Sequence, residues 1–363
     1  MELSDLPIEV WEMIVENCDY ISRVSLHSTS TLMHHLADTA RLYIPQVHIN
    51  EFRGGIKLCF KFETFRRFAW NYTDINENST KITQFNKDDV YVDGKTSAEL
   101  TAEMLGRVCF KKNVTIGYLS IRNVFDIETQ LAAEVQKTFE KAGNHPLKIE
   151  TIHWKRKGEN TDLFDFFMNN CQPIALKHLM VVSRKPVDLF TKYRNLISSL
   201  KKLEVCGKLV ATEDDILGLK ARMLHLTSNS FTNNLVQKLV EKLIQEDVPG
   251  SCIVMKRREE GLTFENIPKQ FDEIPSKVYR TVSSFAKYSA ERQKRVIIST
   301  GTYGCSAAVQ NYSGSEYDHM DLQMDCETEC RDKCLQTLFS CNCYIPWICA
   351  EDDVANNFGY YDD

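Results

Sequence analysis

The sequence has no run of eighteen or more apolar residues, so no segment predicts a membrane-spanning helix. It also lacks an excess of positive charge, because 44 lysine and arginine residues stand against 50 acidic residues and the formal net charge is −6. Short basic runs such as 256–258 are interpreted as solvated loops, not as a footprint for nucleic acid. The first residues include Glu2 and Asp5 and no apolar core, so we expect no signal peptide. We therefore expect neither a membrane nor a nucleic acid as partner, and a reducing location in the cytoplasm or nucleus.

Motifs that carry catalytic chemistry are missing as well. The sequence has no glycine-rich phosphate-binding loop and no nucleophile elbow. His34 and His35 are paired imidazoles with no further ligand nearby in the sequence, so we interpret them as a solvated or partly buried pair. The acidic pairs at 214–215 and 259–260 fit a helix start and a loop. These absences predict a protein that binds another protein, is not an enzyme and needs no cofactor.

What the sequence does have is an ordinary globular composition. Its 363 residues are 43% hydrophobic and 26% charged, and this length suffices for two or three folded units. We expect a helical module at 1–45, a linker hairpin and helix at 46–110, and a strand–helix domain at 111–260. An extension of unknown fold at 261–320 and a cysteine-rich acidic tail at 321–363 follow.

The first forty residues predict two or three short helices. Pro7 suits the first turn of a helix, where its missing N–H group has no partner anyway, and Asp5 precedes it as an N-cap candidate. Apolar residues recur at helical spacing within 10–15, and a second helical run covers 24–36 after a polar break at 19–22. So short a segment cannot bury this much apolar surface alone. We therefore expect its outer face to be a docking surface.

This segment resembles an F-box, the motif that docks onto the small adaptor subunit of SCF-type ubiquitin ligases. The residues that match the family pattern without gaps are Leu6, Pro7, Glu9, Val10, Ile14, Val24, Leu26 and Leu36. The sequence departs from that pattern at Cys18, Thr29 and Met33. The alternative is an ordinary helical hairpin that completes the core of its own domain, in an interaction scaffold unrelated to ubiquitin ligases.

The resemblance implies partners and binding residues. The partners would be the SCF adaptor subunit, the cullin scaffold and an unknown substrate protein. The protein-binding residues would lie among Leu6, Pro7, Val10, Ile14, Val24, Leu26, Met33 and Leu36. The sequence does not separate those that dock from those that pack inward.

The middle of the chain repeats a short apolar pattern. Two apolar residues three positions apart are followed by a third two positions further on, at 116–121, 149–154, 176–181, 200–205 and 221–226, with a weaker copy at 249–254. Successive copies begin 21 to 33 residues apart, close to the period of about 20 to 29 residues in a leucine-rich repeat. The pattern predicts short parallel strands that each end in a helical connection.

Other periodic runs predict the remaining elements. Helices are expected at 96–105, 126–142, 162–168, 191–199, 213–219 and 233–245. Alternating apolar residues predict a hairpin at 46–62 that turns at Gly54-Gly55. The polar stretch 71–89 is expected to be a loop.

An F-box followed by such a region is similar to the nematode F-box proteins that carry an FTH domain. The runs that suggest this lie at 137–154, 175–182 and 199–205, and the similarity covers about residues 3–260. It implies a substrate-recruiting subunit of a ubiquitin ligase that holds its target on the open strand face. The expected fold class is α/β: an N-terminal all-α F-box, a short leucine-rich-repeat-like strand–helix stack and a cysteine-rich tail.

Six of the thirteen cysteines lie in the tail: Cys326, Cys330, Cys334, Cys341, Cys343 and Cys349. In a reducing compartment such a cluster suggests zinc, in an oxidising one three disulfides, and a poorly ordered or independently evolved tail is a third interpretation. The spacing from Cys330 to Cys349 also resembles part of the extracellular cysteine-rich region of degenerin-type sodium channels. Because only about twenty-five residues match, the resemblance implies no channel activity. The resemblance raises the hypothesis of a fused or mispredicted gene.

Overall fold

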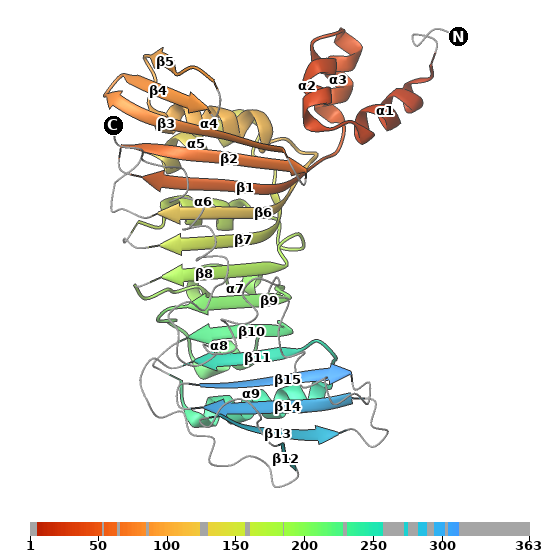
Figure 1. Ribbon diagram of the computed structural model, residues 1–363, viewed down its shortest axis with the longest axis vertical. Coiled ribbons are helices and arrows are strands. Elements are labelled where there is room, and N and C mark those ends of the chain that lie inside the picture. The colour runs from red at the N-terminus through yellow and green to blue at the C-terminus, as the bar shows by residue number, and fades with distance from the viewer. Residues whose placement is uncertain are drawn as a thin grey trace. The chain divides into compact units, whose positions relative to one another are not determined.

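The computed structural model describes residues 6–52, 54–63, 66–84, 87–123, 130–156, 160–183, 185–227, 231–256, 272–274, 282–288, 294–301 and 304–311. The chain divides into two compact units, Met1–Ala221 and Arg222–Asp363, whose elements are labelled in Figure 1. The tail at 321–363 lies outside the described residues, and so do the six cysteines named as metal-ligand or disulfide candidates.

The first unit begins with the helices α1 (Ile8–Asn17), α2 (Tyr20–His27) and α3 (Thr31–Thr39). The Asp19 side chain accepts a hydrogen bond from the Ser22 backbone N–H (2.7 Å) and starts α2, so the polar break is shorter than expected. The helical run predicted over 24–36 is divided between two helices, so the described part of this segment contains three short helices, where two or three were predicted. Ser30 accepts a bond from the Met33 N–H (3.2 Å) and caps a separate helix, α3.

The sheet of the first unit has the order β9-β8-β7-β6-β1-β2-β3-β4-β5. Its strands are β1 (Leu42–Phe52), β2 (Gly55–Glu63), β3 (Arg66–Asn76), β4 (Ser79–Gln84), β5 (Val90–Asp93), β6 (Val114–Asn123), β7 (Lys148–Arg156), β8 (His178–Ser183) and β9 (Lys202–Cys206). Neighbours from β1 through β6 to β9 run parallel, whereas β1 to β5 form an antiparallel meander.

The hairpin predicted at 46–62 is confirmed as β1–β2, with Gly54 in the turn at a φ of +82°, which glycine adopts without strain. The loop predicted at 71–89 is wrong, since most of this stretch belongs to β3 and β4. Its polar side chains satisfy one another: Asp74 accepts hydrogen bonds from Thr80 Oγ1 (3.1 Å) and from Ser97 Oγ (2.6 Å). A strand can therefore form there without an apolar alternation.

The strands predicted from the apolar pattern are confirmed at 116–121, 149–154, 176–181 and 200–205. Their central residues are in register, because Ile152 pairs with Leu119 on one side and with Leu179 on the other. These side chains are buried beneath the helices; Trp154, two positions on, stacks on Phe164 with ring centroids 4.0 Å apart. The pattern therefore marks the helix-covered face of the sheet.

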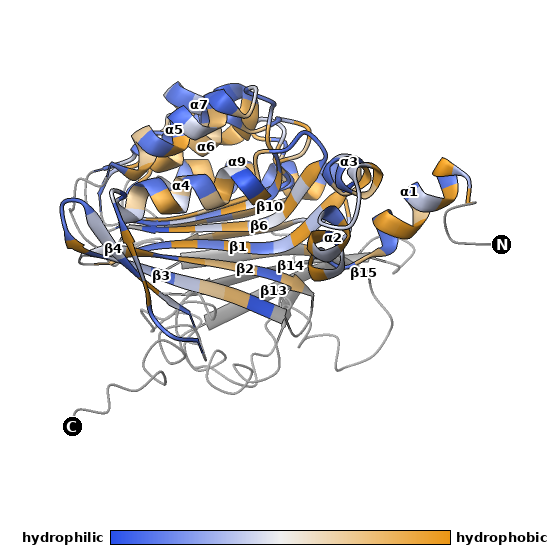
Figure 2. Ribbon diagram, turned by 90° about the horizontal axis from the view of Figure 1, so that it is seen from above, coloured by the Kyte–Doolittle hydropathy of each residue, from blue (hydrophilic) through white to orange (hydrophobic). Residues whose placement is uncertain are grey.

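The helices that connect these strands are α4 (Ser97–Val108), α5 (Leu131–Lys141), α6 (Asp162–Asn170), α7 (Phe190–Ile197) and α8 (Glu213–Leu217). They confirm the predicted helices apart from their ends, and the start predicted for α5 falls outside the described residues. Figure 2 shows α4, α5, α6 and α7 on one face of the sheet. In the described part of this unit, no helix covers the opposite face of the parallel strands.

The second unit contains β10 (Met223–Thr227), α9 (Asn233–Glu246), β11 (Cys252–Lys256), β12 (Asp272–Ile274), β13 (Val282–Tyr288), β14 (Lys294–Gly301) and β15 (Gly304–Asn311). The strands β10 and β11 run parallel, and β11, β15, β14, β13 and β12 follow in antiparallel order. The α/β class is thus confirmed for the described chain: N-terminal helices precede strand-rich sheets with helices. None of the described helices has the length and apolar content to cross a membrane.

Candidate functional site

The three N-terminal helices enclose a small apolar core. Val15 of α1, Met33 and Leu36 of α3, and Ala40 are buried in it, with exposed fractions of 0 to 9%. Trp11, Leu26 and Ala37 are partly buried and pack against this core. Of the predicted binding residues, Met33 and Leu36 therefore pack inward, and Leu26 contributes to the same core.

A buried arginine joins the ends of these helices. The guanidinium of Arg23 donates to the carbonyl oxygens of Glu16 (2.8 Å) and Cys18 (3.0 Å) at the end of α1, and to that of Ala40 (3.5 Å) after α3. The last carbonyls of a helix have no partner within the helix, so the arginine satisfies groups that would otherwise need water. Burial lowers the pKa of Arg23 from its ordinary value. Sequence patterns did not reveal this role.

The helices also carry exposed apolar residues, which we call the outer apolar surface. It consists of Ile8 and Met13 on α1, Ile21 and Val24 on α2, and Leu32 on α3, with exposed fractions from 39 to 63%. The sequence prediction included only Val24 from this set, because the other four are not fixed positions of the family pattern. The remaining predicted residues Leu6, Val10 and Ile14 are half-buried, and Pro7 is exposed.

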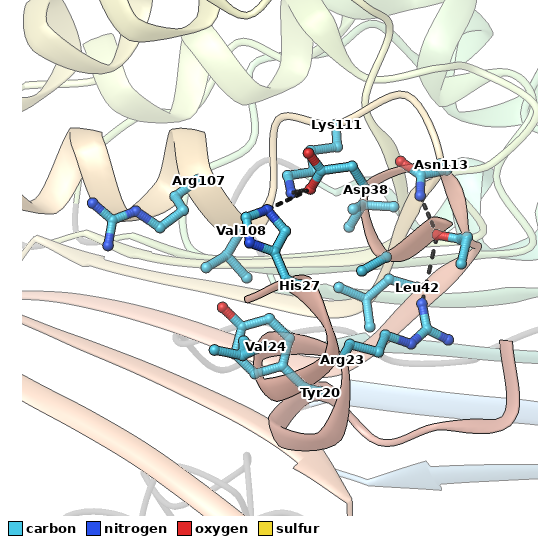
Figure 3. A pocket seen from close by; sticks show the side chains of 13 residues that line it. Tyr20, Arg23, Val24, His27, Asp38, Leu42, Arg107, Val108, Lys111 and Asn113 are labelled. Atoms are coloured by element: carbon cyan, nitrogen blue, oxygen red, sulfur yellow. Dashed lines mark hydrogen bonds and ion pairs between the residues drawn. The ribbon is translucent and has the colours of Figure 1, made fainter. Parts of the chain in front are cut away.

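Contacts join the helices to the sheet that follows. The Tyr20 ring stacks on Phe62 of β2 with centroids 4.1 Å apart, and Lys111 forms an ion pair with Asp38 (2.7 Å). The Asn113 side-chain amide donates to the carbonyl oxygen of Ala40. A cavity of about 160 Å³ lies between these contacts, as Figure 3 shows. Val24 of the outer apolar surface lines this cavity as well, although its side chain remains exposed.

A second candidate site is the face of the parallel strands that the helices leave open. Here the side chains alternate with the buried apolar pattern, and many of them are polar. Tyr118 of β6 lies 2.6 Å from Nδ1 of His153 on β7, and Glu204 on β9 contacts His178 (3.0 Å) and Lys202 (2.6 Å). We call these residues, together with Lys155, the polar strand face.

Burial shapes the ionisation of this face. Desolvation, reinforced by nearby arginines such as Arg122, lowers the pKa of His153 to about 3 and that of His48 to about 4. Burial raises the pKa of Tyr118 to about 12. Both imidazoles are therefore neutral at physiological pH and act as hydrogen-bonding groups, not as charges.

The structure also changes the interpretation of His34. The sequence suggested no ligand near the His34–His35 pair, but folding brings His27 and Asp38 next to His34. The ring centroids of His27 and His34 lie 3.7 Å apart, while His35 is exposed and outside the group. The spacing along α3 places only Asp38, four positions after His34, on the same helical face, whereas His27 comes from α2 and depends on how the two helices cross.

Comparison with known proteins gives one family match. Residues 3–45 match the model of the F-box domain, and no curated protein matches the chain. The N-terminal helices are therefore an F-box domain. Such domains in general bind the adaptor subunit of SCF-type ubiquitin ligases, and proteins that carry them are typically substrate adaptors, not enzymes. The FTH-type and degenerin resemblances stay predictions.

Proposed function

We propose that this protein is a substrate-recruiting subunit of an SCF-type ubiquitin ligase. The observation that carries the proposal is an F-box domain whose outer apolar surface is left exposed by its own chain. Exposed apolar groups on adjacent helices are typical of an interaction site. The protein then acts as an adaptor without catalytic residues or cofactor, in the cytoplasm or nucleus, because the catalytic steps belong to other subunits.

In this proposal the predicted F-box residues divide by their burial. Val24 docks onto the ligase adaptor together with Ile8, Met13, Ile21 and Leu32, and the half-buried residues Leu6, Val10 and Ile14 with the exposed Pro7 extend that contact. Leu26, Met33 and Leu36 support the contact by holding the helices together. The cullin scaffold is reached through the ligase adaptor and needs no contact of its own.

The polar strand face is our candidate for the substrate site, within a leucine-rich-repeat-like FTH region at 111–260. Its position supports this, since helices occupy the other face. Strand faces of stacked repeats commonly serve as binding surfaces. Lys155, Lys202 and Glu204 give this face charged groups, of which Lys202 and Glu204 pair with each other.

A pull-down with the purified ligase adaptor tests whether the F-box binds that adaptor. The double variant Val24→Asp/Leu32→Glu places charges on the outer apolar surface and should reduce adaptor binding at least tenfold. Ile174→Glu is the matched control, because Ile174 is 87% exposed and lies outside the F-box. Unchanged binding in the double variant would place the docking contact on other residues. Absence of adaptor binding by the unmodified chain would favour the alternative, an interaction scaffold unrelated to ubiquitin ligases.

A second comparison tests the proposed substrate site on the polar strand face. Proteins that co-purify with the chain are identified by mass spectrometry for Lys155→Glu/Lys202→Glu and for Lys137→Glu/Lys141→Glu, which alters exposed lysines on α5 instead. The first variant should lose a subset of proteins that the second retains, while both keep the ligase adaptor. Loss of the same proteins from both variants would place the substrate site elsewhere.

A further inference from the structure

Three potential metal ligands from two F-box helices lie close together, next to the contact between these helices and the sheet. His27 ends α2, and His34 and Asp38 lie one turn apart on α3. Their nitrogen and oxygen atoms all lie within 4.8 Å of one another. Figure 3 shows His27 directed toward Asp38, and Lys111 pairs with Oδ1, the oxygen of the carboxylate that lies nearest His27.

The distance between His34 and Oδ2 of Asp38 fits two ligands of one ion better than a direct hydrogen bond. His27 Nε2 lies 3.6 Å from Asp38 Oδ1, and His34 Nε2 lies 3.4 Å from Asp38 Oδ2. A hydrogen bond between such atoms normally spans about 2.7 to 3.2 Å. Two ligands at about 2.0 to 2.1 Å from a tetrahedral zinc ion are instead about 3.3 to 3.4 Å apart.

The side chains are accessible enough for an ion to enter and for water to remain. Their exposed fractions are 41% for His27, 54% for His34 and 38% for Asp38. Two imidazoles and one carboxylate are a common donor set for zinc, whereas magnesium prefers oxygen ligands and keeps most of its water. The site therefore offers three protein ligands and one open position.

Lys111 makes the carboxylate a ready ligand in spite of its own charge. It forms its ion pair with Oδ1, which leaves Oδ2 directed to His34. A ligand carboxylate held by a second hydrogen bond is the usual arrangement around protein-bound metals.

We propose that His27, His34 and Asp38 form a zinc-binding site that joins α2 to α3, with water as the fourth ligand. The ion braces the F-box helices, and through Lys111 the same carboxylate also connects them to the sheet that follows. This inference stands apart from the proposed adaptor function, because the ligands do not belong to the outer apolar surface.

Modification of histidines by diethyl pyrocarbonate tests the site residue by residue. The full chain is titrated with ZnCl2, and acylation of each histidine is read by peptide mass spectrometry. Zinc should protect His27 and His34 together while the exposed neighbour His35 stays reactive. This readout is independent of zinc that binds to cysteines elsewhere in the chain. MgCl2 at the same concentrations should protect neither residue.

Two variants complete the experiment. In His34→Asn the zinc concentration that half-protects His27 should rise at least tenfold, whereas His35→Asn should leave it unchanged. Zinc should also raise the thermal unfolding midpoint of the F-box in His35→Asn more than in His34→Asn. Unchanged reactivity of His27 and His34 with zinc, or equal protection of His35, would overturn the proposal.

Discussion

At the scale of single residues, Arg23 shows how a small helical module stays folded while its apolar outer side remains exposed. The core of the F-box contains few large side chains, so it contributes little stability by apolar burial alone. The guanidinium adds charge-assisted hydrogen bonds to carbonyls at two helix ends. The packing of α1 and α3 around α2 therefore depends on one cation as much as on the core.

Replacing this cation tests its contribution. Arg23→Met keeps the aliphatic stem but leaves the helix-end carbonyls unsatisfied, and it should destabilise the F-box by about 2 to 4 kcal/mol. Hydrogen exchange of the amides in 8–39 should accelerate at least about thirtyfold. Arg41→Met, at an exposed arginine just after the F-box helices, should change the exchange only slightly. Equal effects of the two variants would refute the role of Arg23.

Buried histidines on the polar strand face predict an acid-sensitive fold. The imidazole of His153 is 1% exposed and its pKa is about 3, so the folded state excludes the proton that the unfolded state binds below about pH 6.5. Stability from this group is therefore present above pH 6.5 and is lost as the pH falls toward 3. Between pH 6.5 and 5 the expected loss is about 1.5 kcal/mol.

Urea unfolding at several pH values measures this effect. In this window, His153→Gln should lower the slope of the free energy of unfolding against pH by the contribution of about one proton. His145→Gln alters an exposed histidine and should leave this slope unchanged. Restricting the range to pH 5 and above keeps most carboxylates ionised in both states. A slope that is identical in His153→Gln and in the unmodified chain would contradict the expectation.

At the scale of elements, the sequence predicted the helices and strands whose apolar side chains recur periodically. The strands through Leu119, Ile152 and Leu179 and the helices between them followed from one face being buried. The parts of β3 and β4 within 71–89 were missed because most of their side chains are polar, and Asp74 is satisfied by Thr80 and Ser97. A pattern of hydropathy cannot show such pairing, since the partners come from distant positions.

The same limit applies to the candidate site. The F-box pattern predicted the helices and the inward residues Met33 and Leu36 among its members, because those positions have fixed spacing. It did not predict the exposed residues Met13 and Leu32 or the group around His34. Exposure and side-chain clusters depend on how helices cross, and the spacing along one helix does not determine that crossing.

A capping interaction tests the stability of one element. Thr96 and Glu99 form a capping box at the start of α4: the Thr96 hydroxyl accepts from the Glu99 N–H (3.2 Å), and the Glu99 carboxylate accepts from the Thr96 N–H (2.8 Å). Thr96→Ala should therefore lower the free energy of unfolding by about 1 kcal/mol. Thr96→Ser keeps the hydroxyl and should stay within about 0.5 kcal/mol of the unmodified chain. A similar loss in both variants would argue against the cap.

At the scale of the whole molecule, β1 is the strand on which the arrangement of the first unit depends. It follows directly after the F-box helices and lies between β6, which runs parallel to it, and β2, which runs antiparallel. Ile44 within it is fully buried and pairs with Ile116. The F-box match extends to residue 45, so the sequence-defined domain includes the first residues of this central strand.

Two truncated chains that differ by six residues should therefore behave differently. A chain that begins at Ala40 lacks α1, α2 and α3 but keeps β1; it should still unfold cooperatively and should fail to bind the ligase adaptor. A chain that begins at Gln46 also lacks Leu42 and Ile44, so the sheet loses buried apolar contacts. Its free energy of unfolding should be lower by a further amount of about 2 to 5 kcal/mol, as expected when a large buried side chain is removed. Urea unfolding followed by circular dichroism compares the two. If both chains unfold at the same urea concentration, the start of β1 contributes nothing to the sheet, and the boundary of the F-box lies at residue 45 in structure as well as in sequence.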